Sequence, residues 1–200
     1  MQIYTRQGDD GKTMLLDRQR VWKDDPRVQV GGALDELCSW IGVASAHMPA
    51  ARPELVTQLR EVQNELFAVG AAAQLAGRMD KQPTMRMVGV KECERIEGWI
   101  DAMKPELPAM HGFIAPGGCA AAAFVHVARG VCRRAESGMV SLLRNADAEG
   151  AATLADAVAY LNRLSDFLFV LARFCNHLNG VEETVIGRVG GECGGCGCGG

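Results

Sequence analysis

The feature of this sequence that most limits its fold is a run of apolar residues that alternates steps of four and three. The members of the run are Leu55, Leu59, Val62, Leu66 and Val69. This spacing places them on one side of an α-helix, the pattern of a helix that buries one face in a bundle. Pro53 suits the first turn of such a helix, and Gly77 is expected to end it.

Four further segments carry the same kind of period. They are predicted as helices from Ala33 to Pro49, from about Val88 to just before Pro105, from Cys119 to about Arg144, and from Ala151 to about Asn179. The last two would each be roughly 40 Å long, with 145–149 and Gly150 as the break between them. No internal repeat and no strand run points to an α/β sheet. We therefore predict an all-α protein, a five-helix bundle in one domain.

Composition agrees with a helical fold and narrows the function. Of the 200 residues 48% are hydrophobic and only 6% aromatic, and the formal net charge is -3. A weakly negative chain does not favour binding to nucleic acid or to an acidic membrane surface. No apolar run reaches the length of a signal peptide or a membrane span, so we expect a cytoplasmic location. Five cysteines in the helical patterns are read as buried thiols: Cys38, Cys93, Cys119, Cys132 and Cys175.

Residues 1–31 show no sustained period and carry many groups that bind ligands. Gly11, Lys12 and Thr13 match the end of a Walker A motif, but the first glycine of that motif would fall at Arg6. Glycines still allow backbone N–H groups to approach a phosphate, and an aspartate can hold Mg²⁺ through water. The segment is therefore either a phosphate-binding loop or a solvated loop.

The segment 119–144 carries the sharpest polar cluster. His126, Arg129, Arg133 and Glu136 are spaced by three, four and three, so they share one face of the predicted helix. Apolar neighbours leave little of this helix for water. Two arginines at i and i+4 repel unless an anion or carboxylate lies between them, and such a pair suits a polyphosphate.

Polar residues on other predicted helices add to this cluster. Asp35 and Glu36 lie amid apolar neighbours on the first helix, and Asn162 and Asp166 share a face of the last. Di-metal carboxylate chemistry in a bundle needs Glu-x-x-His pairs. None of the four histidines has a glutamate three residues before it, so a ferritin-type di-iron centre is poorly supported.

Six blocks occur in order along the chain: YTRQGDDGKT (4–13), KDDPR (23–27), GALDEL (32–37), FIAPGG (113–118), CRRAE (132–136) and YLNRLSDFLF (160–169). Together they resemble the PduO-type ATP:cob(I)alamin adenosyltransferases, from Tyr4 to about Asn179. The resemblance implies a five-helix bundle of ferritin-like up-down topology, assembled as a homotrimer with active sites between subunits. It implies transfer of the 5′-deoxyadenosyl group of ATP to the cobalt of cob(I)alamin or a related reduced corrinoid, which releases triphosphate and forms adenosylcobalamin.

The same resemblance divides the chain and assigns its site residues. Residues 1–188 are expected to form the adenosyltransferase domain, with 1–31 as the ATP-binding loop and 33–179 as the bundle. The residues that match the loop around the ATP phosphates are Thr5, Arg6, Gly8, Asp9, Gly11, Lys12 and Lys23. Those that match the helical groups around the nucleotide and Mg²⁺ are Arg129, Arg133, Glu136 and Asn162.

Three residues match catalytic positions of the family. Arg133 grips the nucleotide, Asp35 matches a carboxylate that pairs with an arginine of the neighbouring subunit (here Arg133), and Phe113 matches an aromatic that closes over the lower corrin face. Mg²⁺ is expected on the ATP phosphates, near Glu136. A flavoprotein reductase and an adenosylcobalamin-dependent acceptor enzyme are the further partners that the resemblance implies.

The chain departs from the family pattern at three places. Ser137 stands where the family commonly has arginine, and Cys38 stands where it usually has asparagine. The segment 189–200 is rich in glycine and carries Cys193, Cys196 and Cys198, one thiol short of a tetrahedral zinc site. This tail is read as a mobile segment, a metal or redox sensor, or a delivery element. For the whole chain two alternatives remain: a non-catalytic corrinoid- or nucleotide-binding chaperone or sensor, and a purely structural helical oligomer.

Overall fold

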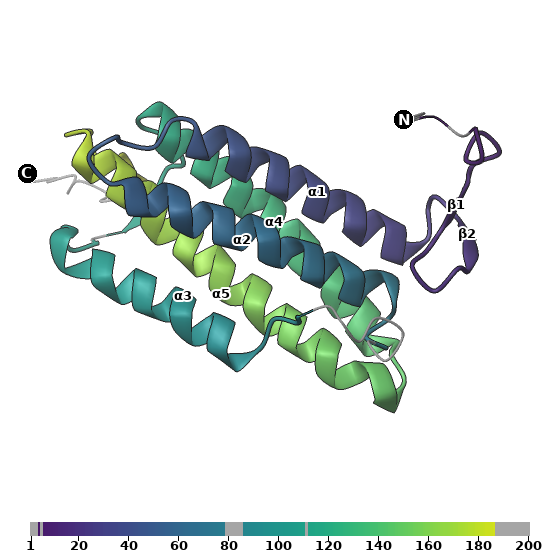
Figure 1. The fold of residues 1–200 in the computed structure, drawn as a ribbon. Helices are drawn as coiled ribbons and strands as arrows, with labels where there is room; N and C mark the ends of the chain where they lie inside the picture. Colours follow the sequence, from purple (N-terminus) through teal and green to yellow (C-terminus); the bar gives the residue numbers. More distant parts are fainter. Residues whose placement is uncertain (1–3, 5, 79–85, 111, 187–200) are drawn as a thin grey trace, which may run out of the picture.

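The computed structural model describes residues 4, 6–78, 86–110 and 112–186, and the predicted five-helix bundle is confirmed in them. The helices are α1 (Pro26–Ser45), α2 (Pro53–Gln74), α3 (Val90–Met103), α4 (Ala120–Arg144) and α5 (Ala148–Leu178). They lie side by side along one direction (Figure 1). Helix α4 packs against α5 and α1, α2 lies against α1, and α3 lies against α5.

The core is formed where these helices bury their apolar stripes. The stripe of α2 is buried as predicted: Leu55, Leu59, Val62, Leu66 and Val69. The hydroxyl of the fully buried Tyr160 has a partner, because it donates a hydrogen bond to Glu65 at 2.8 Å. Among the described helices, none is both long and apolar enough to span a membrane.

The cysteines are less uniformly buried than the sequence suggests. Cys132 and Cys175 are buried, whereas Cys38, Cys93 and Cys119 are half-buried. Burial raises the pKa of the Cys175 thiol to about 12. The prediction of five buried thiols is therefore confirmed in full for two, whereas the other three are only partly buried, packed against the core.

Helix α1 begins at Pro26 rather than at Ala33, so the expected loop is shorter than 1–31. Pro26 stands at the first helical position, and the Asp25 carboxylate accepts a hydrogen bond from the Arg27 N–H at 2.9 Å. Proline at this position and aspartate as the N-cap are both favourable. Before the helix, β1 (Lys12–Met14) and β2 (Arg20–Trp22) form an antiparallel hairpin within the segment that we predicted to be a loop.

The turn between α4 and α5 also differs from expectation. Asp147 caps α5 by accepting from the Gly150 N–H at 3.0 Å, so Gly150 lies inside the first turn instead of breaking the helix. A methyl group at Gly150 would overlap the carbonyl oxygen of Ala76. Gly77, at φ +80°, follows the end of α2 and faces Gly150. These two glycines allow the ends of α2 and α5 to meet.

The connection from α3 to α4 contains a short 3₁₀ helix, η2 (Lys104–Glu106), and a short strand, β3 (Phe113–Ile114). Strand β3 pairs in antiparallel fashion with β4 (Val185–Ile186), which follows α5. The segment 105–118 lies between two predicted helices, and this pairing ties its strand to the residues after the last helix.

Candidate functional site

The polar face of α4 is the first part of the candidate site. The guanidinium of Arg129 lies 5.3 Å from the ring centre of Phe169 on α5. Glu136, on the same face, accepts a hydrogen bond from the Asn162 amide of α5 at 3.0 Å. The face therefore joins α4 to α5 through a cation–π contact at one level and an amide–carboxylate contact about two turns further along.

This face is more open to solvent than we predicted from the sequence. Arg133 is exposed, and Val127 on the same helix is 41% exposed. Within the described residues no ion pair involves Arg133. The prediction that apolar neighbours leave little of α4 for water is wrong for the single chain, because only one side of the helix packs against α1 and α5. An exposed arginine without a carboxylate partner is available to an anion or to another subunit.

Asp35 is likewise exposed and not buried. Its neighbour Glu36 forms an ion pair with Arg134 of α4 within the same chain. This pair occupies the contact between α1 and α4, and the structure does not bring Asp35 and Arg133 together. The contact that the resemblance implies for these two residues is between subunits.

At the start of the α4 face, His126 is buried, at 8% exposure, and neither ring nitrogen has a hydrogen-bond partner among the described residues. Burial and, secondarily, the charge of Arg129 lower the pKa of His126. The imidazole is therefore neutral near pH 7.

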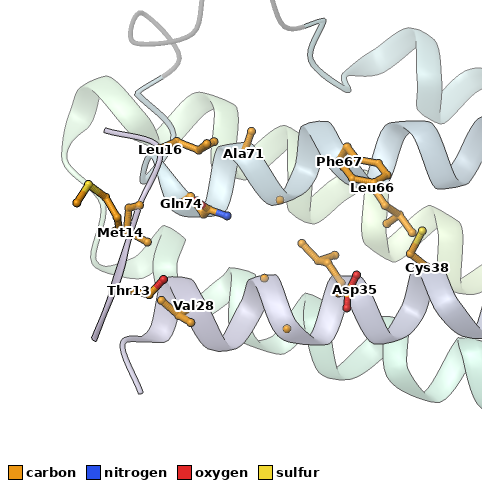
Figure 2. A pocket seen from close by; sticks show the side chains of 15 residues that line it. Thr13, Met14, Leu16, Val28, Asp35, Cys38, Leu66, Phe67, Ala71 and Gln74 are labelled. Carbon is orange, nitrogen blue, oxygen red and sulfur yellow. The ribbon is translucent and has the colours of Figure 1, made fainter. Parts of the chain in front are cut away.

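A groove between α1 and α2 was not foreseen. Its volume is about 560 Å³, and β1 closes one end (Figure 2). Asp35 lies on the α1 wall and Phe67, 72% exposed, on the α2 wall. Added methyl groups at Gly31 and Gly32 would meet no atom within 4 Å. The sequence did contain a sign of this groove, because two adjacent glycines stand where a packed helix would carry larger side chains.

The N-terminal loop is shaped by contacts that Lys12 and Lys23 make within the loop and hairpin. The Lys23 amine donates to the carbonyl of Gly8 at 2.8 Å, and the Lys23 N–H donates to the carbonyl of Gly11 at 2.9 Å. Gly11 has a φ of +81°, which favours glycine there. The Lys12 ammonium lies 4.6 Å from the ring centre of Trp22. The loop is thus a folded turn on the hairpin, with Arg6 among its exposed residues.

The remaining residues of the predicted site lie on the N-terminal loop, on β3 or outside the described residues. Asp9 is exposed on the N-terminal loop, while Thr5 and the three tail cysteines lie outside the described residues. Phe113 is 84% exposed on β3. The hairpin lies beyond one end of the bundle, whereas the C-terminal end of α5, which β4 follows, lies at the other (Figure 1). One chain therefore joins Arg129, Glu136 and Asn162 but separates the N-terminal loop from Phe113.

Comparison with known proteins identifies the family of the chain. The model of the family described as cobalamin adenosyltransferase matches residues 3–175. The chain therefore belongs to the cobalamin adenosyltransferase family, which confirms the resemblance read from the sequence.

Individual relatives cover nearly the whole chain. A corrinoid adenosyltransferase of Mycobacterium tuberculosis is 40% identical over 191 residues, which are 95% of this chain and 94% of that protein. One of Bacillus subtilis is 37% identical over 188 residues, 92% of this chain and 91% of that protein. The solved structure of a variant PduO-type ATP:corrinoid adenosyltransferase of Lactobacillus reuteri, complexed with cobalamin and ATP, is 32% identical. It has a TM-score of 0.84 and covers 92% of this chain and 99% of its own.

Proposed function

We propose that the chain transfers the 5′-deoxyadenosyl group of ATP to the cobalt of cob(I)alamin or a related reduced corrinoid, forming adenosylcobalamin and releasing triphosphate. The observation that carries this proposal is the α4 face of a chain in this family, where Arg129 and Arg133 stand beside the Glu136–Asn162 contact. Two arginines one turn apart suit the charge of a triphosphate.

The protein has little acid–base work in this reaction. Reduced cobalt is a strong nucleophile, and it attacks the ribose C5′ while the bond from C5′ to the triphosphate oxygen breaks. The protein must hold C5′ in line with the metal, which is a positioning task. Arg129, Arg133 and Lys12 would stabilise the negative charge that the leaving triphosphate gains.

Mg²⁺ fits the residues on the α4 face as a companion of the triphosphate. Glu136 is half-buried and uses one carboxylate oxygen for Asn162, which leaves the other for a hard cation. No group of three or more metal-binding side chains occurs in the described residues, so the phosphates would supply most ligands and Glu136 would hold the ion. When bound, the ion would neutralise charge on the leaving triphosphate.

Phe113 is proposed to act before the transfer step. Cob(II)alamin is hard to reduce while its lower axial ligand remains bound. An aromatic ring that closes over the lower corrin face would exclude that ligand and leave a four-coordinate species that a flavoprotein reductase can reduce. The exposure of Phe113 on a short strand supports such a role, since its ring is free to meet a ligand.

We further propose that the active sites lie between subunits of a homotrimer. Asp35 and Arg133 are both exposed in the single chain and would pair across the interface. Such sharing would account for the separation of the N-terminal loop from Phe113, whose strand pairs with β4 after the far end of α5. The product would then pass to an enzyme that uses adenosylcobalamin.

A single-turnover assay tests the proposed function. Chemically reduced cobalamin and ATP are mixed with the protein without oxygen, and conversion is followed in the visible spectrum. Formation of adenosylcobalamin with release of triphosphate is expected. ATP binding without conversion would instead support a non-catalytic chaperone or sensor, and absence of ATP binding would support a structural oligomer.

A further inference from the structure

The segment that carries Phe113 is held from both sides by one turn of α5. We propose that Arg173 and Asn176 are positioning residues that fix the backbone on which Phe113 stands. This inference rests on the proposed role of Phe113. It adds two residues outside the six family-like blocks of the sequence.

Arg173 holds the side of the segment that precedes Phe113. It is 8% exposed, and its guanidinium donates a hydrogen bond to the carbonyl of Pro108 at 2.9 Å. The same guanidinium contacts both carboxylate oxygens of Glu183, at 3.0 and 3.1 Å. One buried cation therefore links a residue of the segment before β3 with a residue just before β4.

Asn176, one turn further along α5, holds the side that follows Phe113. It is 2% exposed, its amide oxygen accepts from the Cys119 N–H at 2.9 Å, and its amide nitrogen donates to the carbonyl of Gly117 at 3.1 Å. Gly118 has a φ of +107°, and a methyl group there would overlap the Asn176 side chain. The Asn176 carbonyl also accepts from the Val181 N–H at 2.9 Å.

These contacts enclose the β3–β4 pair. The Ala115 N–H donates to the Thr184 carbonyl at 2.8 Å, so the pairing continues beside Phe113. The backbone of Phe113 is thus anchored, while its ring remains 84% exposed. A group that must exclude an axial ligand acts well only if its position is set before the ligand arrives.

Stability alone is a weak explanation for this arrangement. A buried ion pair such as Arg173–Glu183 often stabilises a fold no better than well-packed apolar residues do. Its value here is geometric, because a guanidinium can hold a backbone carbonyl and a carboxylate at once in a fixed orientation.

The test compares two reactions of the full-length protein. One begins from cob(II)alamin with a flavin reductant, and the other begins from chemically made cob(I)alamin. Arg173→Gln is expected to slow the first about tenfold or more and the second by less than about threefold, since misplacement by about 1 Å can cost up to a hundredfold. The yield of four-coordinate cob(II)alamin, read by electron paramagnetic resonance, should fall with the first rate.

Two variants guard against a trivial outcome. Asn176→Asp keeps the acceptor for Cys119 and loses the donor to Gly117. This variant replaces Arg173→Gln if the latter does not fold, and it too should slow the cob(II)alamin reaction more than the cob(I)alamin reaction. Arg163→Gln is the matched control, because Arg163 is an α5 arginine whose ion pairs run to Glu97 and Asp166 at 2.8 and 3.0 Å. It should leave the ratio of the two rates unchanged.

A double variant with Phe113→Ala decides whether the effect passes through the ring. Phe113→Ala alone should lower the cob(II)alamin reaction more than the cob(I)alamin reaction, and adding Arg173→Gln should lower the ratio no further. Equal losses in both reactions for Arg173→Gln, or an additive effect in the double variant, would overturn the inference. An unchanged ratio for Phe113→Ala would overturn the proposed role of Phe113 itself, and the positioning role with it.

Discussion

The arginines on α4 and α5 have different surroundings. Arg134 is paired with Glu36, Arg173 is buried against Glu183, and Arg133 is exposed with no ion pair among the described residues. Spacing in the sequence identified the residues that share a face, because a helix fixes those angles. It could not distinguish a paired arginine from a free one, since the partners lie far away in the chain.

The free arginine carries the first prediction. Arg133→Ala should slow adenosyl transfer by about 100-fold or more, because an arginine on a triphosphate supplies several kcal/mol in a site with little water. Thermal unfolding should change little, since the side chain is exposed. Single-turnover rates at saturating ATP measure the effect, with Arg144→Ala in the last turn of α4 as the matched control. Near-normal turnover of the Arg133 variant would refute its assignment.

At the scale of elements, the helices could be predicted more securely than their ends. Periodicity located all five, but Gly31 and Gly32 hide the apolar period in the first turns of α1. The capping signal of Asp25 before Pro26 was present and points to the observed start. The fit of Gly150 against Ala76 had no signal in the sequence, because it depends on two segments far apart in the chain.

The cap of α1 predicts a pH dependence. Hydrogen bonds from the Arg27 side chain hold the pKa of Asp25 below its ordinary value of 3.8. The carboxylate therefore stabilises the fold fully above pH 3.8, and this contribution is lost as the pH falls through the lower folded-state pKa. Asp25→Ala should cost about 1 kcal/mol of unfolding free energy at pH 7.

Urea unfolding at pH 7 and near pH 2 measures this effect. The difference between wild type and Asp25→Ala should shrink at the lower pH. Asp25→Asn, which keeps a capping oxygen, should be milder than alanine at pH 7. A difference that stays constant with pH would show that the charge of Asp25 contributes nothing.

The meeting of α2 and α5 predicts that two glycine substitutions have opposite effects. Gly150→Ala should lower the unfolding free energy by about 1–3 kcal/mol, because the new methyl group must displace the Ala76 carbonyl. Gly98→Ala, on the exposed side of α3 with nothing within 4 Å, should raise it by about 0.5–1 kcal/mol. Thermal unfolding of both variants measures these changes in stability. Similar shifts for the two would mean that helix propensity and not packing controls Gly150.

At the scale of the whole molecule, the bundle could be predicted and the complete site could not. A helical period shows which face is buried but not whether the opposite face meets water or a second chain. The structure leaves Asp35, Arg133 and the groove between α1 and α2 open. The N-terminal hairpin lies at one end of the bundle and the C-terminal end of α5 at the other (Figure 1), and Phe113 lies on β3, which pairs with β4 just after α5. These features are the ones expected if, as proposed, neighbouring subunits share each site.

Shared sites predict that two inactive variants restore activity when they assemble together. We expect Lys12→Ala to disable the loop that a subunit offers to its neighbour, and Arg133→Ala to disable the α4 face. If each site takes its loop from one chain and its α4 face from the next, a trimer that contains both variants keeps about one intact site in three. Co-expression with two different tags, followed by tandem purification and the transfer assay, should recover activity of that order.

The control for this experiment pairs two defects of the same face. Arg133→Ala combined with Glu136→Ala should remain inactive, because both residues lie on α4 and every site then contains one damaged face. Recovery in this control would show that the two residues serve different sites. No recovery in the Lys12 and Arg133 mixture would place the loop and the α4 face of one chain in the same site.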